Sequence, residues 1–126
     1  MPEWLALMQA ANESAWGTSR FAREGNNFFG QWCFRKGCGI VPSRRAKGAT
    51  HEVAAFKSPA ESVRAYMHNL NTGKAYRYLR KIRTGLRRQG KPLTAEVLAA
   101  GLDHYSERGH AYVEDLRRMI RVNRGA

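Results

Sequence analysis

Helical periodicity, interrupted by one glycine-rich stretch, is the feature that most constrains the fold of this chain. Apolar residues recur at three- and four-residue spacing near the N-terminus and again after residue 58, which predicts amphipathic helices. Between them, five glycine and proline residues punctuate the chain from Gly30 to Gly48. The pieces 31–34, 39–43 and 51–56 have the composition of short strands. This order predicts a mostly helical α+β fold with a small β-hairpin lobe.

Start and stop signals delimit the first two helices. Pro2 suits a first helical turn, where its missing N–H costs nothing. A short second helix is predicted over 19–24, with Thr18 as its N-cap and Gly25 as its terminator. In the first helix, the residues expected to face inward are Trp4, Leu7, Met8 and Ala11.

Four further helices are predicted after the glycine-rich stretch. Ser58-Pro59-Ala60-Glu61 is a capping box with proline at the first helical position, and the helix that it opens ends before Gly73. The next helix ends at Gly90, Thr94 caps a short one, and the last runs from about 110 to 122. The residues expected to be buried on these helices are Val63, Tyr66, Met67, Leu70, Ala75, Leu79, Ile82, Leu86, Leu116, Met119 and Ile120.

The length of 126 residues is that of one domain, so we expect a single domain over 1–126 that acts as a monomer. The sequence contains no apolar run of the roughly 20 residues needed to cross a bilayer. No signal-peptide pattern follows Met1. We therefore expect an excised domain from which any export signal has been removed.

Charge is unbalanced, with 22 Lys and Arg against 10 Asp and Glu, for a net charge of +12. Such a surface attracts polyanions, whether nucleic acid, anionic lipid or an acidic wall polymer. The stretch 74–91 holds no acid, and its basic residues are Lys74, Arg77, Arg80, Lys81, Arg83, Arg87, Arg88 and Lys91. A solvated helix face would also explain this stretch. No base-reading motif accompanies it, so we do not expect an obligate nucleic-acid partner.

Cys33 and Cys38 are the only cysteines, with four residues between them. The four histidines are too scattered to complete a zinc site, so no metal is expected. A short-range disulfide and two free thiols both remain open, and export of the protein would favour the disulfide.

Glu13 is a candidate general acid on physical grounds. It lies at the end of an apolar helix, and Trp16 follows within three residues. The negative end of the helix dipole and apolar neighbours both favour the protonated carboxyl. A general acid needs that form near neutral pH. A surface glutamate that merely flanks a turn would show the same features.

Two motifs resemble the signature of a known family. Glu13-Ser14-Ala15-Trp16-Gly17-Thr18-Ser19 is followed by Asn26-Asn27-Phe28-Phe29-Gly30. Together they resemble the E-S-x-W-G-x-S and N-N-x-F-G motifs of bacterial glucosaminidases of glycoside hydrolase family 73. The segments 31–39, 51–56 and 105–109 are similar to the Bax branch of that family. The resemblance implies a lysozyme-like fold and makes Glu13 the catalytic acid.

The group that acts with the acid is less defined by this resemblance. Family members often carry a second carboxylate on the hairpin lobe, where this chain has Ser43 and Arg44, and Glu52 on the returning strand is the nearest candidate. Otherwise the 2-acetamido group of the substrate attacks, and a tyrosine hydroxyl polarises it. Tyr112 fits that role by resemblance, with Tyr105 seven residues earlier as a substrate-binding candidate.

Aromatic residues near the two motifs are candidates for the walls of a sugar cleft. These residues are Trp16, Phe28, Phe29 and Trp32. Asn27 is a candidate for hydrogen bonding to an acetamido group. Packing in the core is the competing interpretation, and it is the one that we favour for Trp16 and Phe29.

The combined prediction is an exported endo-β-N-acetylglucosaminidase of the periplasm or cell wall. It would hydrolyse β-1,4 bonds of peptidoglycan or a related N-acetylated glycan without a cofactor, and its basic face would bind anionic wall polymers. The alternatives are a muramidase, a lytic transglycosylase, or a non-catalytic module that binds the wall or nucleic acid.

Overall fold

The computed structural model describes residues 1–124, which form two compact units. One unit contains residues 1–9 and the chain from Met67 onward, and the other contains residues 10–66. The helices are α1 (Glu3–Glu13), α2 (Arg20–Gly25), α3 (Pro59–Thr72), α4 (Arg77–Arg88), α5 (Ala95–Ala99) and α6 (His110–Arg124). Two 3₁₀ turns, η1 (Lys74–Tyr76) and η2 (Ala100–Leu102), and three strands, β1 (Trp32–Cys33), β2 (Gly39–Ile40) and β3 (Glu52–Ala54), complete the described elements. The predicted α+β class is confirmed.

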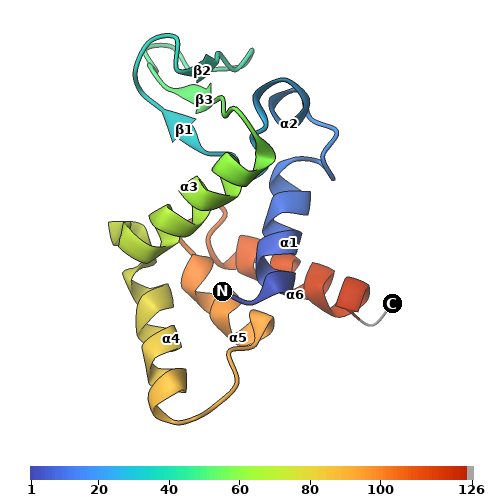
Figure 1. The fold of residues 1–126 in the computed structure, drawn as a ribbon, viewed down its shortest axis with the longest axis vertical. Helices are drawn as coiled ribbons and strands as arrows, with labels where there is room; N and C mark the ends of the chain where they lie inside the picture. The colour runs from blue at the N-terminus through green and yellow to red at the C-terminus, as the bar shows by residue number, and fades with distance from the viewer. Residues whose placement is uncertain (125–126) are drawn as a thin grey trace. The chain divides into compact units, whose positions relative to one another are not determined.

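Leucine and isoleucine side chains form the core of the first unit. Helices α4, α5 and α6 pack around η2, as Figure 1 shows in yellow, orange and red. The fully buried residues of this core are Leu79, Leu98, Leu102, Leu116 and Ile120. At Gly101 a Cβ atom would collide with the backbone of Leu79, so only glycine lets η2 approach α4 this closely.

The second unit contains a three-stranded antiparallel sheet in the order β1-β3-β2. Trp32 pairs with Val53 on one side of β3, and Ile40 pairs with the same residue on the other side. The lobe is therefore a small sheet rather than a simple hairpin (Figure 1). Because β3 is the central strand, all three of its residues are buried, whereas the two-residue edge strands β1 and β2 are more exposed.

The capping box of α3 is confirmed, whereas the cap of α2 differs by one residue from the prediction. Ser58 Oγ accepts the N–H of Glu61 at 3.2 Å, at the start of α3. Ser19, not Thr18, caps α2 by accepting the N–H of Ala22 at 3.1 Å. Thr18 Oγ1 instead donates to the carbonyl of Ala15 at 2.6 Å, which uses its hydroxyl in the preceding turn.

Several side chains expected to be buried are exposed. On α1, Trp4 and Leu7 face outward, while Leu5, Met8 and Gln9 are buried. The buried stripe is displaced from the predicted one because it includes the polar Gln9, whose amide has a partner in the core. Other residues expected inside but found exposed are Val63 and Ala75.

No helix within residues 1–124 is long and apolar enough to span a membrane.

Candidate active site

Glu13 is the last residue of α1 and is followed by a turn of unusual backbone geometry. Ala15, Trp16 and Gly17 have φ values of 50°, 57° and 80°. Residues other than glycine rarely adopt this left-handed backbone conformation, so the surrounding hydrogen bonds must hold the turn in place. Ser14 Oγ donates to the carbonyl of Ala10 at 2.6 Å and accepts the N–H of Gly17 at 2.9 Å.

This turn presents Trp16 to solvent, with 63% of its surface exposed. The sequence-based expectation that Trp16 packs in the core is therefore wrong. Trp16 is thus an exposed aromatic three residues after Glu13.

The second motif forms a loop that Asn27 organises from inside. Asn27 is buried, and its Oδ1 accepts the N–H groups of Phe29, Gly30 and Gln31 at 3.3, 2.9 and 3.2 Å. Its Nδ2 donates to the carbonyls of Gln31 and Ala54 at 3.0 and 2.8 Å. Both polar atoms of the side chain bond the backbone of its own unit, so Asn27 shapes the loop and ties it to β3.

Gly30 connects this loop to the glutamate. It has a φ of 71°, and a Cβ built on it would lie 3.2 Å from Oε2 of Glu13. A side chain at position 30 would therefore be strained and would press on the carboxyl group. The backbone of the second motif therefore lies against the carboxyl of the first at Gly30.

The remaining aromatic residues of the second motif differ in burial. Phe29 is buried and stacks on Tyr66, with ring centroids 3.9 Å apart and planes at 15°, which confirms the expectation of core packing. Phe28 is half-buried, and its N–H donates to Ser62 Oγ at 3.3 Å. Of Phe28 and Phe29, only Phe28 exposes part of its ring, where a ligand could contact it.

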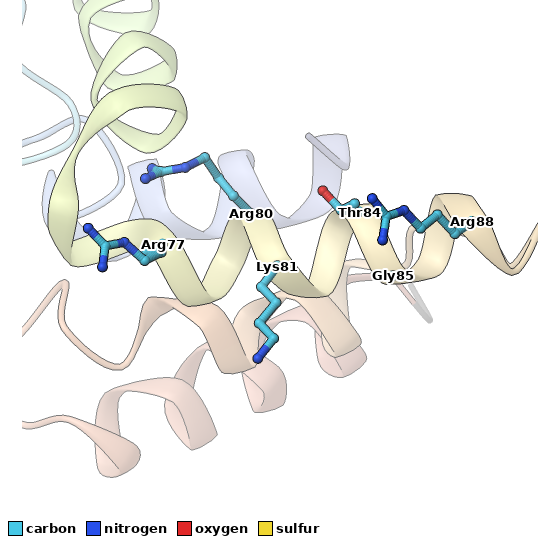
Figure 2. Close-up of a pocket in the computed structure, with 6 residues that line it drawn as sticks. All are labelled: Arg77, Arg80, Lys81, Thr84, Gly85 and Arg88. Carbon is cyan, nitrogen blue, oxygen red and sulfur yellow. The ribbon is translucent and has the colours of Figure 1, made fainter.

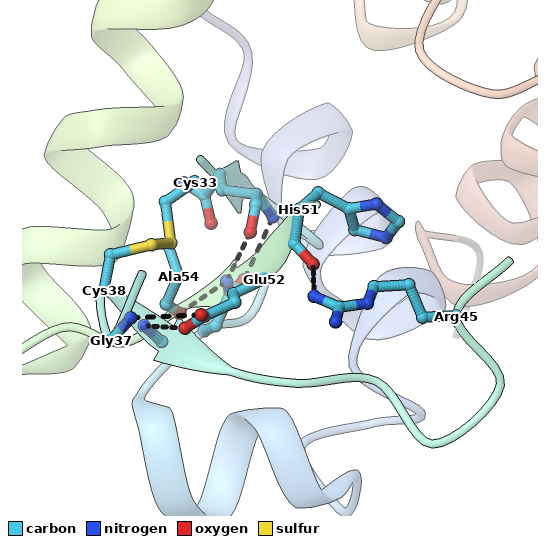
Figure 3. Close-up of a disulfide and its surroundings, with 10 residues drawn as sticks. Cys33, Gly37, Cys38, Arg45, His51, Glu52 and Ala54 are labelled. Carbon is cyan, nitrogen blue, oxygen red and sulfur yellow. Dashed lines mark hydrogen bonds between the residues drawn. A yellow bond between two sulfur atoms is a disulfide. The ribbon is translucent and has the colours of Figure 1, made fainter. Parts of the chain in front are cut away.

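Glu52 lies in β3 and is only 6% exposed. Its Oε2 accepts the N–H of Gly37 and its Oε1 accepts the N–H of Gly39, both at 3.0 Å (Figure 3). These two backbone donors lower the pKa of Glu52 below its usual 4.5, and they outweigh the opposing effect of burial. The carboxylate is therefore ionised, and both of its oxygens hold the loop that joins β1 to β2.

A disulfide between Cys33 and Cys38 closes the same loop (Figure 3). The structure thus selects the disulfide from the two alternatives left open by the sequence. Arg45 Nη1 donates to the carbonyl of His51 at 2.9 Å, which holds the return of the chain toward β3. The sheet is small, but several independent contacts fix it.

Trp32 is 58% exposed on β1 and stacks on His51, with centroids 3.7 Å apart and planes at 10°. Phe34 is 70% exposed and meets the indole edge-on at 6.4 Å. Sequence reasoning did not single out His51 or Phe34 as site residues. The pairing of β1 with β3 brings His51 to Trp32, and Phe34 follows Trp32 by two residues along the chain.

Tyr112 belongs to the first unit and is 2% exposed. Its hydroxyl oxygen accepts a hydrogen bond from Nε2 of the buried Gln9 at 3.1 Å. Tyr105 stacks on it at 5.9 Å with planes at 4°, and Tyr76 lies 5.9 Å beyond Tyr105. Sequence reasoning did not identify Gln9 as a site residue. The signal that could have found it is its polar side chain among the apolar residues of α1.

The basic face of α4 carries a shallow hollow along the helix. Arg77, Arg80, Lys81, Thr84, Gly85 and Arg88 line it (Figure 2). Arg80 Nη1 donates to the carbonyls of Leu70 and Gly73 at 3.0 and 2.8 Å, so this cation also joins α4 to the end of α3. Arg83 donates to Asn71, and its burial, together with the nearby Arg87 and Arg80, lowers its pKa. Within residues 1–124, no carboxylate lies within ion-pair distance of the α4 cations.

The described part of the chain contains no group of three His, Cys, Asp or Glu side chains placed to hold a metal ion.

These features define a helical domain whose glutamate lies beside a small sheet, and comparison with known proteins gives its family. The profile described as "Glucosaminidase: Mannosyl-glycoprotein endo-beta-N-acetylglucosaminidase" matches residues 1–125. The chain therefore belongs to the glucosaminidase family, glycoside hydrolase family 73.

One curated relative is protein bax of Escherichia coli strain K12, which is 39% identical over 123 residues. The alignment covers 98% of this chain but only 43% of the relative, so the chain spans less than half of that protein. No solved structure matches the chain.

Proposed function

We propose that this domain is an endo-β-N-acetylglucosaminidase that hydrolyses β-1,4 bonds of peptidoglycan, with Glu13 as the general acid. The observation that carries the proposal is the placement of the Glu13 carboxyl at the end of α1 against the bare backbone of Gly30. Membership of the glucosaminidase family supports a glycan substrate and a glycosidase reaction.

In this mechanism the protonated carboxyl of Glu13 donates its proton to the oxygen that leaves the sugar. The C-terminal end of α1 favours that protonated form, because the backbone carbonyls there carry partial negative charge. Half-burial of the side chain acts in the same direction. The left-handed turn after Glu13 holds the end of the helix in place.

For the attack on the anomeric carbon we propose the 2-acetamido group of the substrate, oriented with the help of the Tyr112 hydroxyl. The hydrogen bond from Gln9 supports this role, because it holds the hydroxyl oxygen of Tyr112 in one position. Glu52 is the alternative, as a base that activates water. Its two backbone hydrogen bonds instead support a structural role, because they lower the pKa of the Glu52 carboxyl and so make it a weaker base toward water.

We further propose that the residues 1–126 act as one monomeric domain, exported to the periplasm or cell wall. The disulfide supports an oxidising compartment. The α4 face would hold the domain on anionic wall polymers, because its cations have no carboxylate partner among the described residues. Trp16, Phe28, Trp32 and Tyr105 remain our candidates for sugar contacts. For Asn27 we propose an indirect role, in which its hydrogen bonds hold the loop of the second motif in shape.

The proposal is tested by the kinetics of Glu13→Gln on a defined soluble glycan. The matched control is Glu24→Gln, at an exposed glutamate of α2. Loss of the transferable proton should lower turnover by about 10²–10⁴-fold in Glu13→Gln, while the control retains wild-type turnover. A folded Glu13→Gln domain that digests the glycan at the wild-type rate would contradict the assignment.

The choice of second group is tested by comparing Tyr112→Phe with Glu52→Gln in the same assay. We expect Tyr112→Phe to lower kcat by about 10²-fold and Glu52→Gln to lower it by less than about tenfold. The reverse order would establish the water-activating mechanism with Glu52 as base.

A further inference from the structure

We propose that Gln31 is a positioning residue for the Glu13 carboxyl, because its side chain fixes to α3 the loop whose Gly30 lies against that carboxyl. The inference rests on the proposed function, since it assumes that Glu13 is the acid. It adds a residue that acts through the loop of residues 27–31 and not through contact with the substrate.

The amide of Gln31 makes two hydrogen bonds to one residue of α3. Its Nε2 donates to the carbonyl of Ser62 at 2.8 Å, and its Oε1 accepts the hydroxyl of Ser62 at 3.4 Å. Ser62 is fully buried, so loss of a partner would leave its hydroxyl without compensation from water. The side chain of Gln31 therefore joins the end of the loop to the first turns of α3.

Two further contacts fix the same loop to α3. The N–H of Phe28 donates to Ser62 Oγ at 3.3 Å. The ring of Phe29 stacks on Tyr66, about one helical turn after Ser62, with ring centroids 3.9 Å apart. A serine hydroxyl has one proton and two lone pairs, so the hydroxyl of Ser62 both donates to the loop and accepts from it.

Asn27 shapes the loop and ties it to β3, whereas Gln31 ties it to α3. The side chain of Asn27 bonds backbone groups within the loop and one carbonyl of β3. The hydrogen bonds to α3 come from Phe28 and Gln31, with Gly30 between them in the sequence. Gly30 has no side chain, so its position against Glu13 depends on what holds the residues on either side of it.

The Glu13 carboxyl is sensitive to the position of this loop. A Cβ atom on Gly30 would lie 3.2 Å from Oε2 of Glu13, so the backbone itself borders the carboxyl. If the loop moves away, water reaches the carboxyl and favours its ionised form over the protonated form that a general acid needs. The carboxyl also gains room to move, and misplacement of a catalytic group by about 1 Å can cost about 10²-fold in rate.

The test compares Gln31→Met with Gln89→Met in the intact chain. Methionine is close to glutamine in length and lacks the amide, and Gln89 is an exposed glutamine at the end of α4, which controls for the change itself. We expect Gln31→Met to lower kcat on a defined soluble glycan by about tenfold with KM unchanged, and Gln89→Met to leave both at the parent values. The alkaline limb of the pH profile of kcat/KM, which reports the ionisation of the acid, should move to lower pH in Gln31→Met alone.

Ser62→Ala tests the same link from the side of α3, and Ser58→Ala controls for the stability of that helix. The hydroxyl of Ser58 accepts the N–H of Glu61, so its loss should lower Tm without removing a bond to the loop. Because Gln31 and Ser62 form one link, the double variant should lose little more turnover than Ser62→Ala alone. Independent losses would instead multiply.

The proposal is overturned if folded Gln31→Met and Ser62→Ala keep the kcat and the pH profile of the parent, or if Ser58→Ala loses as much turnover as Ser62→Ala at an equal loss of Tm. Two NMR measurements without substrate, exchange of the Gly30 amide hydrogen and the carboxyl carbon resonance of Glu13, separate this proposal from the proposed function. Faster exchange and a changed resonance in Gln31→Met, in a domain where Glu13→Gln cleaves as the parent does, would refute the role of Glu13 as acid and leave the link standing. Unchanged exchange and an unchanged resonance would refute the link, whatever the turnover.

Discussion

Replacing Gly30 by alanine separates the stability of the fold from the position of the candidate acid. Gly30 has a φ of 71°, and non-glycine residues in that region cost about 1–2 kcal/mol. The new methyl group would lie 3.2 Å from Oε2 of Glu13, so the carboxyl must shift by a few tenths of an ångström. Because the carboxyl is the end of a flexible side chain, this shift should affect catalysis more than folding.

Gly90 provides the matched control. Its φ of 65° is close to that of Gly30, and a Cβ there has nothing within 4 Å. Gly30→Ala and Gly90→Ala should therefore lose similar stability, seen in thermal unfolding as a Tm lower by about 4 °C per kcal/mol. Only Gly30→Ala should also lose turnover, by about tenfold or more, because misplacing a catalytic group by 1 Å can cost about 10²-fold. Equal turnover in the two folded variants would refute the reasoning about the loop and the acid.

Three further outcomes are expected. Because the pKa of Glu52 is lowered in the folded state, its carboxylate stabilises the fold at pH values above the ordinary pKa of 4.5, and this effect is lost as the pH falls through the folded pKa. Glu52→Gln should therefore lower Tm at pH 7 and flatten the acid side of the plot of Tm against pH. An unchanged plot would contradict the structural role of Glu52. The Cys33–Cys38 disulfide should contribute about 2 kcal/mol by chain-entropy arguments, measured by urea unfolding with and without reductant, and two alkylatable thiols in the unreduced, unfolded protein would rule the bond out. Charge reversal of Lys81, Arg87 and Arg88 to Glu should release the domain from sedimented wall material and leave cleavage of a soluble oligosaccharide unchanged. Arg80 is kept because it donates hydrogen bonds to the carbonyls of Leu70 and Gly73. Loss of that cleavage in a folded variant would instead place the α4 face in the active site.

The helices were predictable where a local signal defines them. Ser58 and Glu61 predict the start of α3 because a capping box involves only neighbouring residues. Periodicity did not identify the buried face of α1, because the buried stripe includes Gln9 and excludes Leu7. Burial of an amide depends on its partner, here Tyr112, which is about a hundred residues away in the sequence.

The candidate site was predictable in its residue types but not in the way they work together. The motifs identified Glu13 and Asn27, yet sequence reasoning assigned Asn27 to the substrate, whereas in the structure its polar atoms bond backbone groups from Phe29 to Ala54. The contact between Gly30 and Glu13 also requires the fold, since each motif alone explains only its own turn. His51 reached Trp32 only through the pairing of β1 with β3.

Mass spectrometry of peptidoglycan digested by the wild-type domain tests the central claim most directly. The account predicts fragments with a new N-acetylglucosamine reducing end, and it predicts that Glu13→Gln produces none of them under the same conditions. A muramic acid reducing end would indicate a muramidase, and an anhydro end would indicate a transglycosylase. Either of these ends, or undiminished digestion by a folded Glu13→Gln domain, would contradict the account.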